Sequence, residues 1–278
     1  CLLMNAKPYL SRDNMRSVSA SVFGHFIIEV CYNFLPIVYP LLIVSMGLRL
    51  GQIGVIAFVQ NIVASLTQPA FGYWSDRWNP WKLAALGVLW GGVFLGLVGL
   101  APNYAVLVLV VAMGALGSAA FHPAGAVIAS MGVGKRKGAV LSLFTVGGTL
   151  GAAVSPLLVA AGLGWLGLRG TSILIPIGLL AGLAMYWRLG VGTKGGSEES
   201  LRTNTDAARV VTNEWVLGLA LVVLAIMCRS WFYVSFITYM PTWIHEQGRT
   251  LAMGGEFLFA FTAFLGGGSL LGGVLSDR

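Results

Sequence analysis

Three polar side chains recur at four-residue intervals within an apolar stretch. His25, Glu29 and Asn33 stand at i, i+4 and i+8, and this spacing places all three on one stripe of a helix. An imidazole beside a carboxylate can hold a proton or pass it on. Two interpretations follow: Glu29 is a proton-coupling carboxylate, with His25 relaying the proton or tuning Glu29, or the charge belongs to a static buried ion pair.

A second charge, Arg229, lies in another apolar stretch. A charge at the centre of a membrane-spanning helix costs about 3 kcal/mol or more, so it needs a partner or a function. When the chain is shifted by the 201 residues that separate Asp76 from Asp277, Arg229 falls one residue from Glu29. We therefore predict that Glu29 and Arg229 lie close together at similar depth, facing one central cavity, and that their separation lets Glu29 take a proton.

Other polar and aromatic side chains could line that cavity and bind a small polar ligand. They are Tyr32, Asn33, Gln60, Gln68, His122 and Tyr233. Arg229 and His122 would suit an anionic group such as a phosphonate. An equally weighted alternative makes His122 a core histidine that bonds a backbone carbonyl freed by Pro123.

Catalytic and metal chemistry have little support in the sequence. It contains no nucleophile–base pair and no cofactor motif, so we expect neither enzyme activity nor a cofactor. The pair His25/Glu29 and the separate His122 are the only candidates for a metal site. Neither group has enough ligands nearby, so no metal is expected.

Membrane-spanning helices must carry these groups. The chain is 57% hydrophobic and 10% charged, with mean hydropathy +0.83, whereas soluble domains carry about 25% charged residues. About 20 apolar residues are needed to cross a bilayer as a helix. The sequence predicts an all-α integral membrane protein with eight such runs, at residues 17–46, 52–73, 83–101, 104–131, 138–163, 170–188, 215–243 and 254–275.

The basic residues predict the orientation. Of the 17 Lys and Arg residues, all but four lie on one set of alternate sides; the exceptions are Arg49, Arg169 and Arg249 on the other side and Arg229 within a span. The positive-inside rule then places the N-terminus in the cytoplasm. Because this rule accounts for the excess of positive charge, we expect no nucleic-acid partner.

A polar, Gly-rich stretch of mixed charge at residues 189–214 predicts a flexible cytoplasmic linker. It separates residues 1–188, with six spans, from residues 215–278, with two. A pattern of Gly, three residues and Asp-Arg occurs in both parts, as Gly72, Asp76, Arg77 and as Gly273, Asp277, Arg278. The second part therefore repeats the start of the first, in the same direction.

Parallel repeats of six spans are typical of the major facilitator superfamily, which the chain resembles from Ser21 onward. The resemblance, closest to a drug-exporting branch, rests on GHFIIEVCYNFLPIVYPLL, QPAFGYWSDR, FHP at 121–123, FTVGGTLGAAVSPLL at 144–158 and RSWFYVSFITYMP from Arg229. It implies twelve spans, so we expect the chain to be a fragment lacking the last four.

The resemblance also implies a gate at the repeated motif. Asp76 would sit against a helix of the other half and brace the outward-facing state, with Arg77 tying the same contact. Gly72 would let helices approach where any side chain would push them apart. The pattern departs from the family at Asn79 and Trp81, and the alternative is that Asp76 and Arg77 only mark a cytoplasmic turn.

Together these features predict a monomeric transporter of the bacterial inner membrane that exports a small polar or drug-like molecule in exchange for protons. An uptake symporter for a small metabolite is the alternative within the same class. A non-transporting membrane scaffold or a lipid scramblase is the alternative from another class.

Overall fold

The computed structural model describes residues 12–131, 133, 137–190 and 213–276. Most of the predicted linker, together with Asp277 and Arg278, lies outside these residues. The described chain is helical and contains no strand. Its elements are α1 (Arg12–Tyr32), α2 (Leu35–Met46), α3 (Leu50–Arg77), α4 (Pro80–Gly96), η1 (Val98–Leu100), α5 (Tyr104–Ser130), α6 (Lys137–Leu166), η3 (Gly167–Ile173), α7 (Leu174–Gly190), α8 (Asn213–Glu246) and α9 (Leu251–Ser276).

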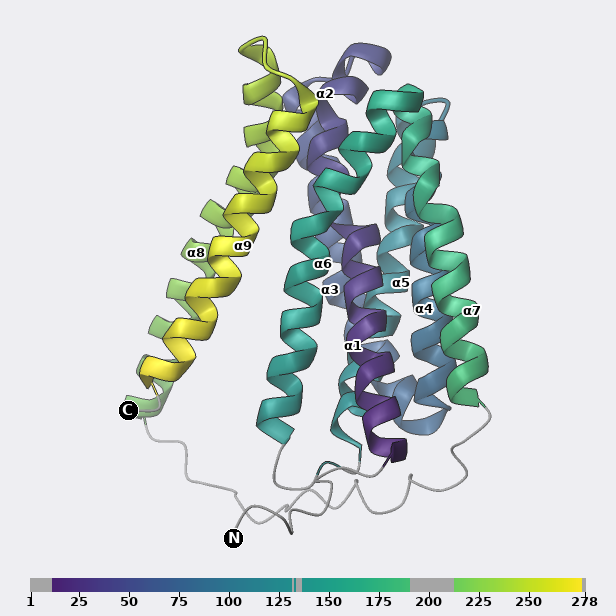
Figure 1. The fold of residues 1–278 in the computed structure, drawn as a ribbon. Coiled ribbons are helices and arrows are strands. Elements are labelled where there is room, and N and C mark those ends of the chain that lie inside the picture. The colour runs from purple at the N-terminus through teal and green to yellow at the C-terminus, as the bar shows by residue number, and fades with distance from the viewer. Residues whose placement is uncertain (1–11, 132, 134–136, 191–212, 277–278) are drawn as a thin grey trace, which may run out of the picture.

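The helices run alternately between two ends of the molecule (Figure 1). Within the described ranges, seven continuous helical stretches are long and apolar enough to cross a membrane, and one of them, Gly138–Trp187, contains both α6 and α7. Each of the eight predicted runs therefore corresponds to a helical segment in the structure, with α1 and α2 together forming the first. The all-α membrane fold is confirmed.

The first run is broken between α1 and α2, at Asn33 and Phe34. Pro36 stands in the first turn of α2, where it has no N–H to donate and its ring excludes a helical bond to the Tyr32 carbonyl. Gln60 of α3 replaces that bond, because its Nε2 donates to the Tyr32 carbonyl at 2.9 Å. The Tyr32 hydroxyl in turn donates to the Gln60 carbonyl at 3.2 Å.

Small residues set the helix spacing in the first seven helices. A Cβ on Gly92 of α4 would come within 2.5 Å of the Cα of Gly178 in α7, and a Cβ on Gly117 of α5 would come equally close to the Gly91 nitrogen. Lipid provides no hydrophobic drive for helices to associate, so close van der Waals packing must hold them together. These glycines make that packing possible.

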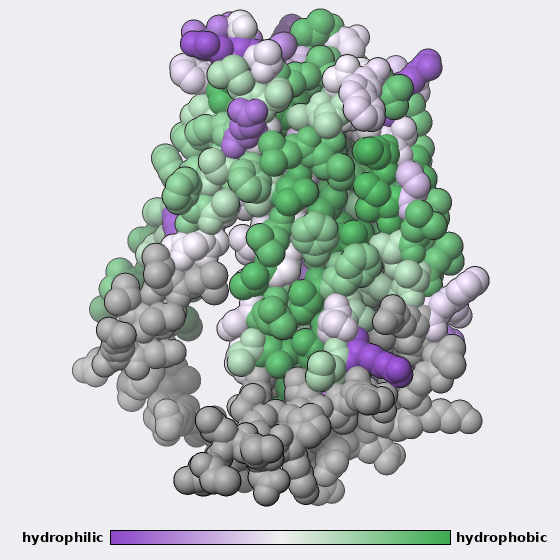
Figure 2. All heavy atoms as spheres, viewed as in Figure 1, coloured by the Kyte–Doolittle hydropathy of each residue, from purple (hydrophilic) through white to green (hydrophobic). Residues whose placement is uncertain are grey.

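The pair α8 and α9 stands against the other helices mainly through contacts with α6 and α2. The Tyr239 hydroxyl of α8 donates to the Leu50 carbonyl at 3.4 Å, and a Cβ on Gly255 of α9 would lie 3.2 Å from the Pro156 carbonyl oxygen of α6. At the other end, α8 and α9 lean away from α1 and α6 (Figure 1). The space-filling view shows an opening between the two groups of helices there (Figure 2).

The charges sort to the two ends as the alternation of loops predicts. Arg49, Arg169 and Arg249 lie at the end where α8 meets α3, whereas Arg77 and Lys82 lie at the opposite, open end. Between the ends, the visible face is mainly apolar (Figure 2).

Candidate functional site

The centre of the candidate site is the Glu29 carboxylate on α1. Its Oε1 lies 3.3 Å from Nε2 of His122 and 3.6 Å from Nε2 of His25. Its other oxygen, Oε2, accepts a hydrogen bond from the side-chain amide of Asn33. The predicted stripe of His25, Glu29 and Asn33 therefore exists, and it is joined by a histidine from another helix.

His25 is oriented by α6. Its Nδ1 lies 2.7 Å from the Phe144 carbonyl oxygen, which can only accept, so Nδ1 carries the proton. The ring stacks on the Phe144 ring with centroids 4.0 Å apart. Gly148 makes room for it, since a Cβ there would collide with Cε1 and Nε2 of His25. In the neutral imidazole, Nε2 is consequently an acceptor aimed at Glu29.

His122 comes to the cluster from α5, which packs against α1. Glu29 is its polar partner, and no backbone carbonyl of the described residues accepts from its ring. The alternative of a core histidine on a carbonyl freed by Pro123 is therefore wrong. Its side chain is 28% exposed, against 15% for Glu29 and 11% for His25, so the cluster opens on the His122 side.

The expectation that neither His25/Glu29 nor His122 has enough ligands nearby for a metal site is also wrong. One ligand atom from each of His25, Glu29 and His122 lies within 4.8 Å of the others. The sequence separation of α1 and α5 hides this proximity, which arises from helix packing.

Arg229 is not the direct partner of Glu29 in this structure. Among the described residues, no ion pair within 4.0 Å joins them, and the Arg229 side chain is exposed on α8. In this arrangement α8 leans away from α1 at the open end (Figure 1), and the conformation-dependent pairing of Glu29 with Arg229 stays a prediction. Tyr233, one turn along α8 from Arg229, is close enough to both Glu29 and Arg229 for an electrostatic interaction with each.

The predicted cavity residues divide into two groups. Gln60 is buried and, with Tyr32, holds the junction of α1 and α2; its assignment to the substrate cavity stays a prediction. Asn33 is half-buried and bonded to Glu29. Tyr233 is half-buried and stacks on Phe261 with centroids 6.0 Å apart.

Gln68 is half-buried on α3. No hydrogen bond joins its side chain to another of the residues described. Its assignment to the substrate cavity stays a prediction.

The gate motif lies at the open end of α3. Asp76 is exposed and has no polar partner among the residues that the structure describes, and the Arg77 guanidinium lies 3.5 Å from the centre of the Tyr73 ring. A Cβ on Gly72 would meet only the Pro123 Cβ, at 3.8 Å. This is an ordinary contact, so the expectation that any side chain at Gly72 would push helices apart is wrong here.

The second copy of the motif is only partly covered. Gly273 lies within α9, and Asp277 and Arg278 lie outside the described residues. The gating role of both copies stays a prediction.

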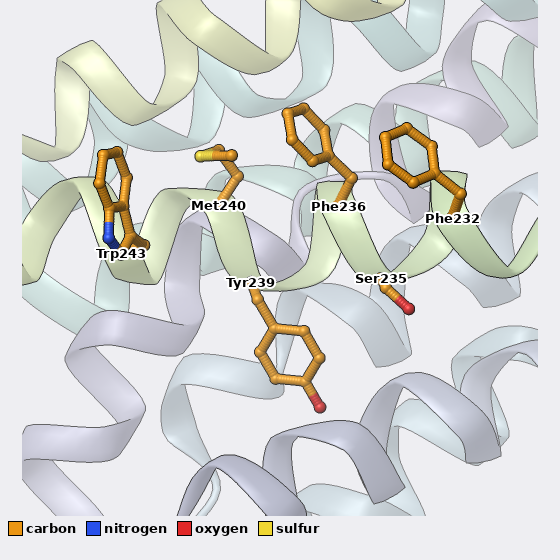
Figure 3. Close-up of a pocket in the computed structure, with 6 residues that line it drawn as sticks. All are labelled: Phe232, Ser235, Phe236, Tyr239, Met240 and Trp243. Atoms are coloured by element: carbon orange, nitrogen blue, oxygen red, sulfur yellow. The ribbon is translucent and has the colours of Figure 1, made fainter.

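A pocket that the sequence did not indicate lies along α8. It has a volume of about 280 Å³ and is lined by Phe232, Ser235, Phe236, Tyr239, Met240 and Trp243. Tyr239 and Ser235 point to one side of the helix, and the other four side chains point to the opposite side (Figure 3). The aromatic spacing at 232, 236, 239 and 243 was the available signal, but aromatic residues are common in membrane helices, so it lacked specificity.

Known proteins resemble this chain over most of its length. The Fosmidomycin resistance protein of Escherichia coli (strain K12) is 26% identical over 275 residues, which cover 96% of this chain and 66% of that protein. The MFS-type transporter YfnC of Bacillus subtilis (strain 168) is 31% identical, covering 91% and 63%. The Probable L-galactonate transporter of Escherichia coli (strain K12) is 25% identical, covering 84% and 55%. The chain thus spans less than two thirds of the length of these relatives.

A solved structure has the same fold. A bacterial homolog of the human lysosomal transporter Spinster, in an inward-facing and occupied conformation, superposes with a TM-score of 0.75 at 18% identity, over 98% of this chain and 62% of that one. A family model described as Major Facilitator Superfamily matches residues 21–278. With its alternating membrane-length helices, the chain therefore belongs to the Major Facilitator Superfamily of membrane transporters.

Proposed function

We propose that this protein is a proton-coupled exporter of a small polar or drug-like molecule. The observation that carries the proposal is the cluster of Glu29, His25 and His122, which sits in the membrane-spanning helices α1 and α5, where α1 packs against α6. Ionisable groups inside membrane-spanning segments cost free energy to bury, and they commonly mark ion or substrate pathways. Two imidazoles and one carboxylate can share a proton among themselves.

Coupling requires that the number of protons held depend on the arrangement of the helices. Glu29 has two sets of candidate partners: the histidines that it contacts here, and Arg229 on α8, which is at a distance from it here. Movement of α8 toward α1 would bring in a positive charge that replaces a proton beside the carboxylate. Tyr233, which interacts electrostatically with both charges, is proposed to lie on the path of that movement.

The substrate is proposed to bind in the same space. His122 is the most exposed member of the cluster, and with Arg229 it can hold an anionic group such as a phosphonate. The relative named Fosmidomycin resistance protein supports export of a drug-like compound. Tyr32, Asn33, Gln68 and Tyr233 are proposed as further walls of the cavity, with Tyr32 acting mainly through the helix junction.

The orientation follows from the charges. The end that carries Arg77 and Lys82 is proposed to face the cytoplasm, together with the N-terminus. The opening between α9 and α6 would then admit cytoplasmic substrate (Figure 2). Asp76 and Arg77, with Asp277 and Arg278, are proposed to form the gate at this end of a monomeric protein in a bacterial inner membrane.

The full-length protein in everted membrane vesicles tests the proposal. An imposed proton gradient should drive accumulation of a phosphonate antibiotic, and Glu29→Gln should abolish gradient-driven accumulation while ligand binding persists. Glu256→Gln is the matched control, because Glu256 lies exposed in the first turns of α9. Unchanged gradient-driven transport by Glu29→Gln would refute the coupling role.

Uptake of a metabolite by symport is the second candidate, favoured by the relative named Probable L-galactonate transporter. The vesicle assay separates the two, because a symporter and an antiporter respond oppositely to the same gradient. Resistance of cells that express the full-length gene would support export. Absence of any gradient-driven flux would favour the scaffold or scramblase alternative.

A further inference from the structure

We propose that His25, Glu29 and His122 form a binding site for a divalent transition-metal ion, with Zn²⁺ as the best fit. The proposal rests on the geometry of the cluster and does not depend on the transport function. It concerns the three side chains that converge from α1 and α5, and their supports on α1 and α6.

The spacing of the ligand atoms suits tetrahedral zinc. Bonds of about 2.0–2.1 Å at tetrahedral angles place ligand atoms about 3.3–3.4 Å apart. Oε1 of Glu29 lies 3.3 Å from Nε2 of His122 and 3.6 Å from Nε2 of His25. All three ligand atoms lie within 4.8 Å of one another, so a shift of His122 toward His25 completes the site.

Two of the three ligands, His25 and Glu29, are oriented as metal ligands usually are. Zinc-bound histidines commonly donate their second N–H to a carbonyl or carboxylate, which sets the tautomer and points the free nitrogen at the metal. His25 does this through Nδ1 and the Phe144 carbonyl, 2.7 Å apart. Asn33 binds Oε2 of Glu29, which leaves Oε1 free for the ion.

The chemistry of the donors selects among ions. Two imidazole nitrogens and one carboxylate oxygen suit Zn²⁺, Ni²⁺, Cu²⁺ or Fe²⁺, whereas Mg²⁺ and Ca²⁺ prefer six or more oxygen ligands. In the neutral tautomer the Nε2 lone pair of His25 faces the Glu29 carboxylate, and the two electron-rich groups repel each other. A cation bound between them would be coordinated by both groups and would remove that repulsion. The donor set therefore favours transition-metal ions, and the ion that occupies the site in the cell depends on metal availability as well as on affinity.

Three protein ligands leave a tetrahedral ion with one open position. The 28% exposed side chain of His122 marks the accessible side. A water molecule or an anionic group of a ligand could fill that position. The ion and a shared proton would occupy the same place, so their binding is mutually exclusive.

The experiment uses the full-length protein in detergent, purified with a tag that contains no histidine. Co²⁺ serves as the spectroscopic probe, because tetrahedral Co²⁺ absorbs visible light far more strongly than octahedral Co²⁺, and Zn²⁺ is then used to displace it. We expect one tetrahedral Co²⁺ per chain, displaced by Zn²⁺. His122→Asn should weaken Zn²⁺ binding by more than the roughly 10–100-fold typical of a lost supporting contact.

The matched control is His245→Asn, because His245 lies on the last turn of α8 and, within the described part of the chain, its Nδ1 meets only the Arg249 carbonyl, at 3.2 Å. This variant should bind Co²⁺ as the natural protein does. An octahedral spectrum in the natural protein, or equal binding by His122→Asn, would overturn the proposal. The spectrum of the natural protein decides the matter even if a variant does not fold, and it is independent of transport.

Discussion

The close contact between Gly148 of α6 and the His25 ring predicts a specific effect of adding one methyl group at Gly148. In Gly148→Ala the new Cβ would overlap Cε1 and Nε2 of His25 and would lie 2.8 Å from Nδ1. The ring cannot retreat freely, because it stacks on Phe144 and is bonded to the Phe144 carbonyl. We expect His25 to shift and its hydrogen bond to break.

The magnitude combines three effects. Overpacking of this kind costs about 1–3 kcal/mol, and loss of one intramolecular hydrogen bond costs about 0.5–1.5 kcal/mol. Replacement of glycine by alanine inside a helix raises the free energy of unfolding by about 1 kcal/mol. The expected net loss in the free energy of unfolding is therefore about 0.5–3.5 kcal/mol.

The assay is reversible unfolding of the full-length protein in mixed detergent micelles. Gly138→Ala is the control on the same helix, because a Cβ there meets no atom within 4 Å, and this variant should be unchanged or gain at most about 1 kcal/mol. If Gly148→Ala were as stable as Gly138→Ala, the close fit of His25 against α6 would be refuted.

Two further predictions concern residues outside the cluster. Gln60→Leu should lower the free energy of unfolding by about 1–3 kcal/mol, because the half-buried Tyr32 carbonyl loses its donor. Gln68→Leu should change it little. The same unfolding assay measures both variants, and an unchanged stability of Gln60→Leu would contradict the junction role. Asp76→Ala should leave stability within about 0.5 kcal/mol, since its side chain is exposed, yet cripple transport in vesicles; full transport would remove the proposed gate.

Several features of the fold were accessible from the sequence. The eight apolar runs correspond to helical rods because a bilayer demands a fixed length of apolar helix. The spacing of His25, Glu29 and Asn33 was sufficient to place them on one stripe, since the helical period is local. The break at Asn33 and Phe34 was missed, although Pro36 was the available signal.

Tertiary packing decided the composition of the site. The approach of His122 to Glu29 depends on how α5 lies against α1, and the orientation of His25 depends on a carbonyl and a glycine in α6. The hydrogen bond from Gln60 to a backbone carbonyl on another helix also arises from tertiary packing. None of these relations leaves a trace in sequence spacing.

The sequence by itself determined the class of the protein, its membrane-spanning helices and the polar stripe of α1, because hydropathy and helical period act over neighbouring residues. Only the tertiary structure decided which group Glu29 meets. That choice depends on the distance between helices far apart in the chain, where 3.3 Å to His122 forms a contact and the lean of α8 leaves Arg229 beyond reach.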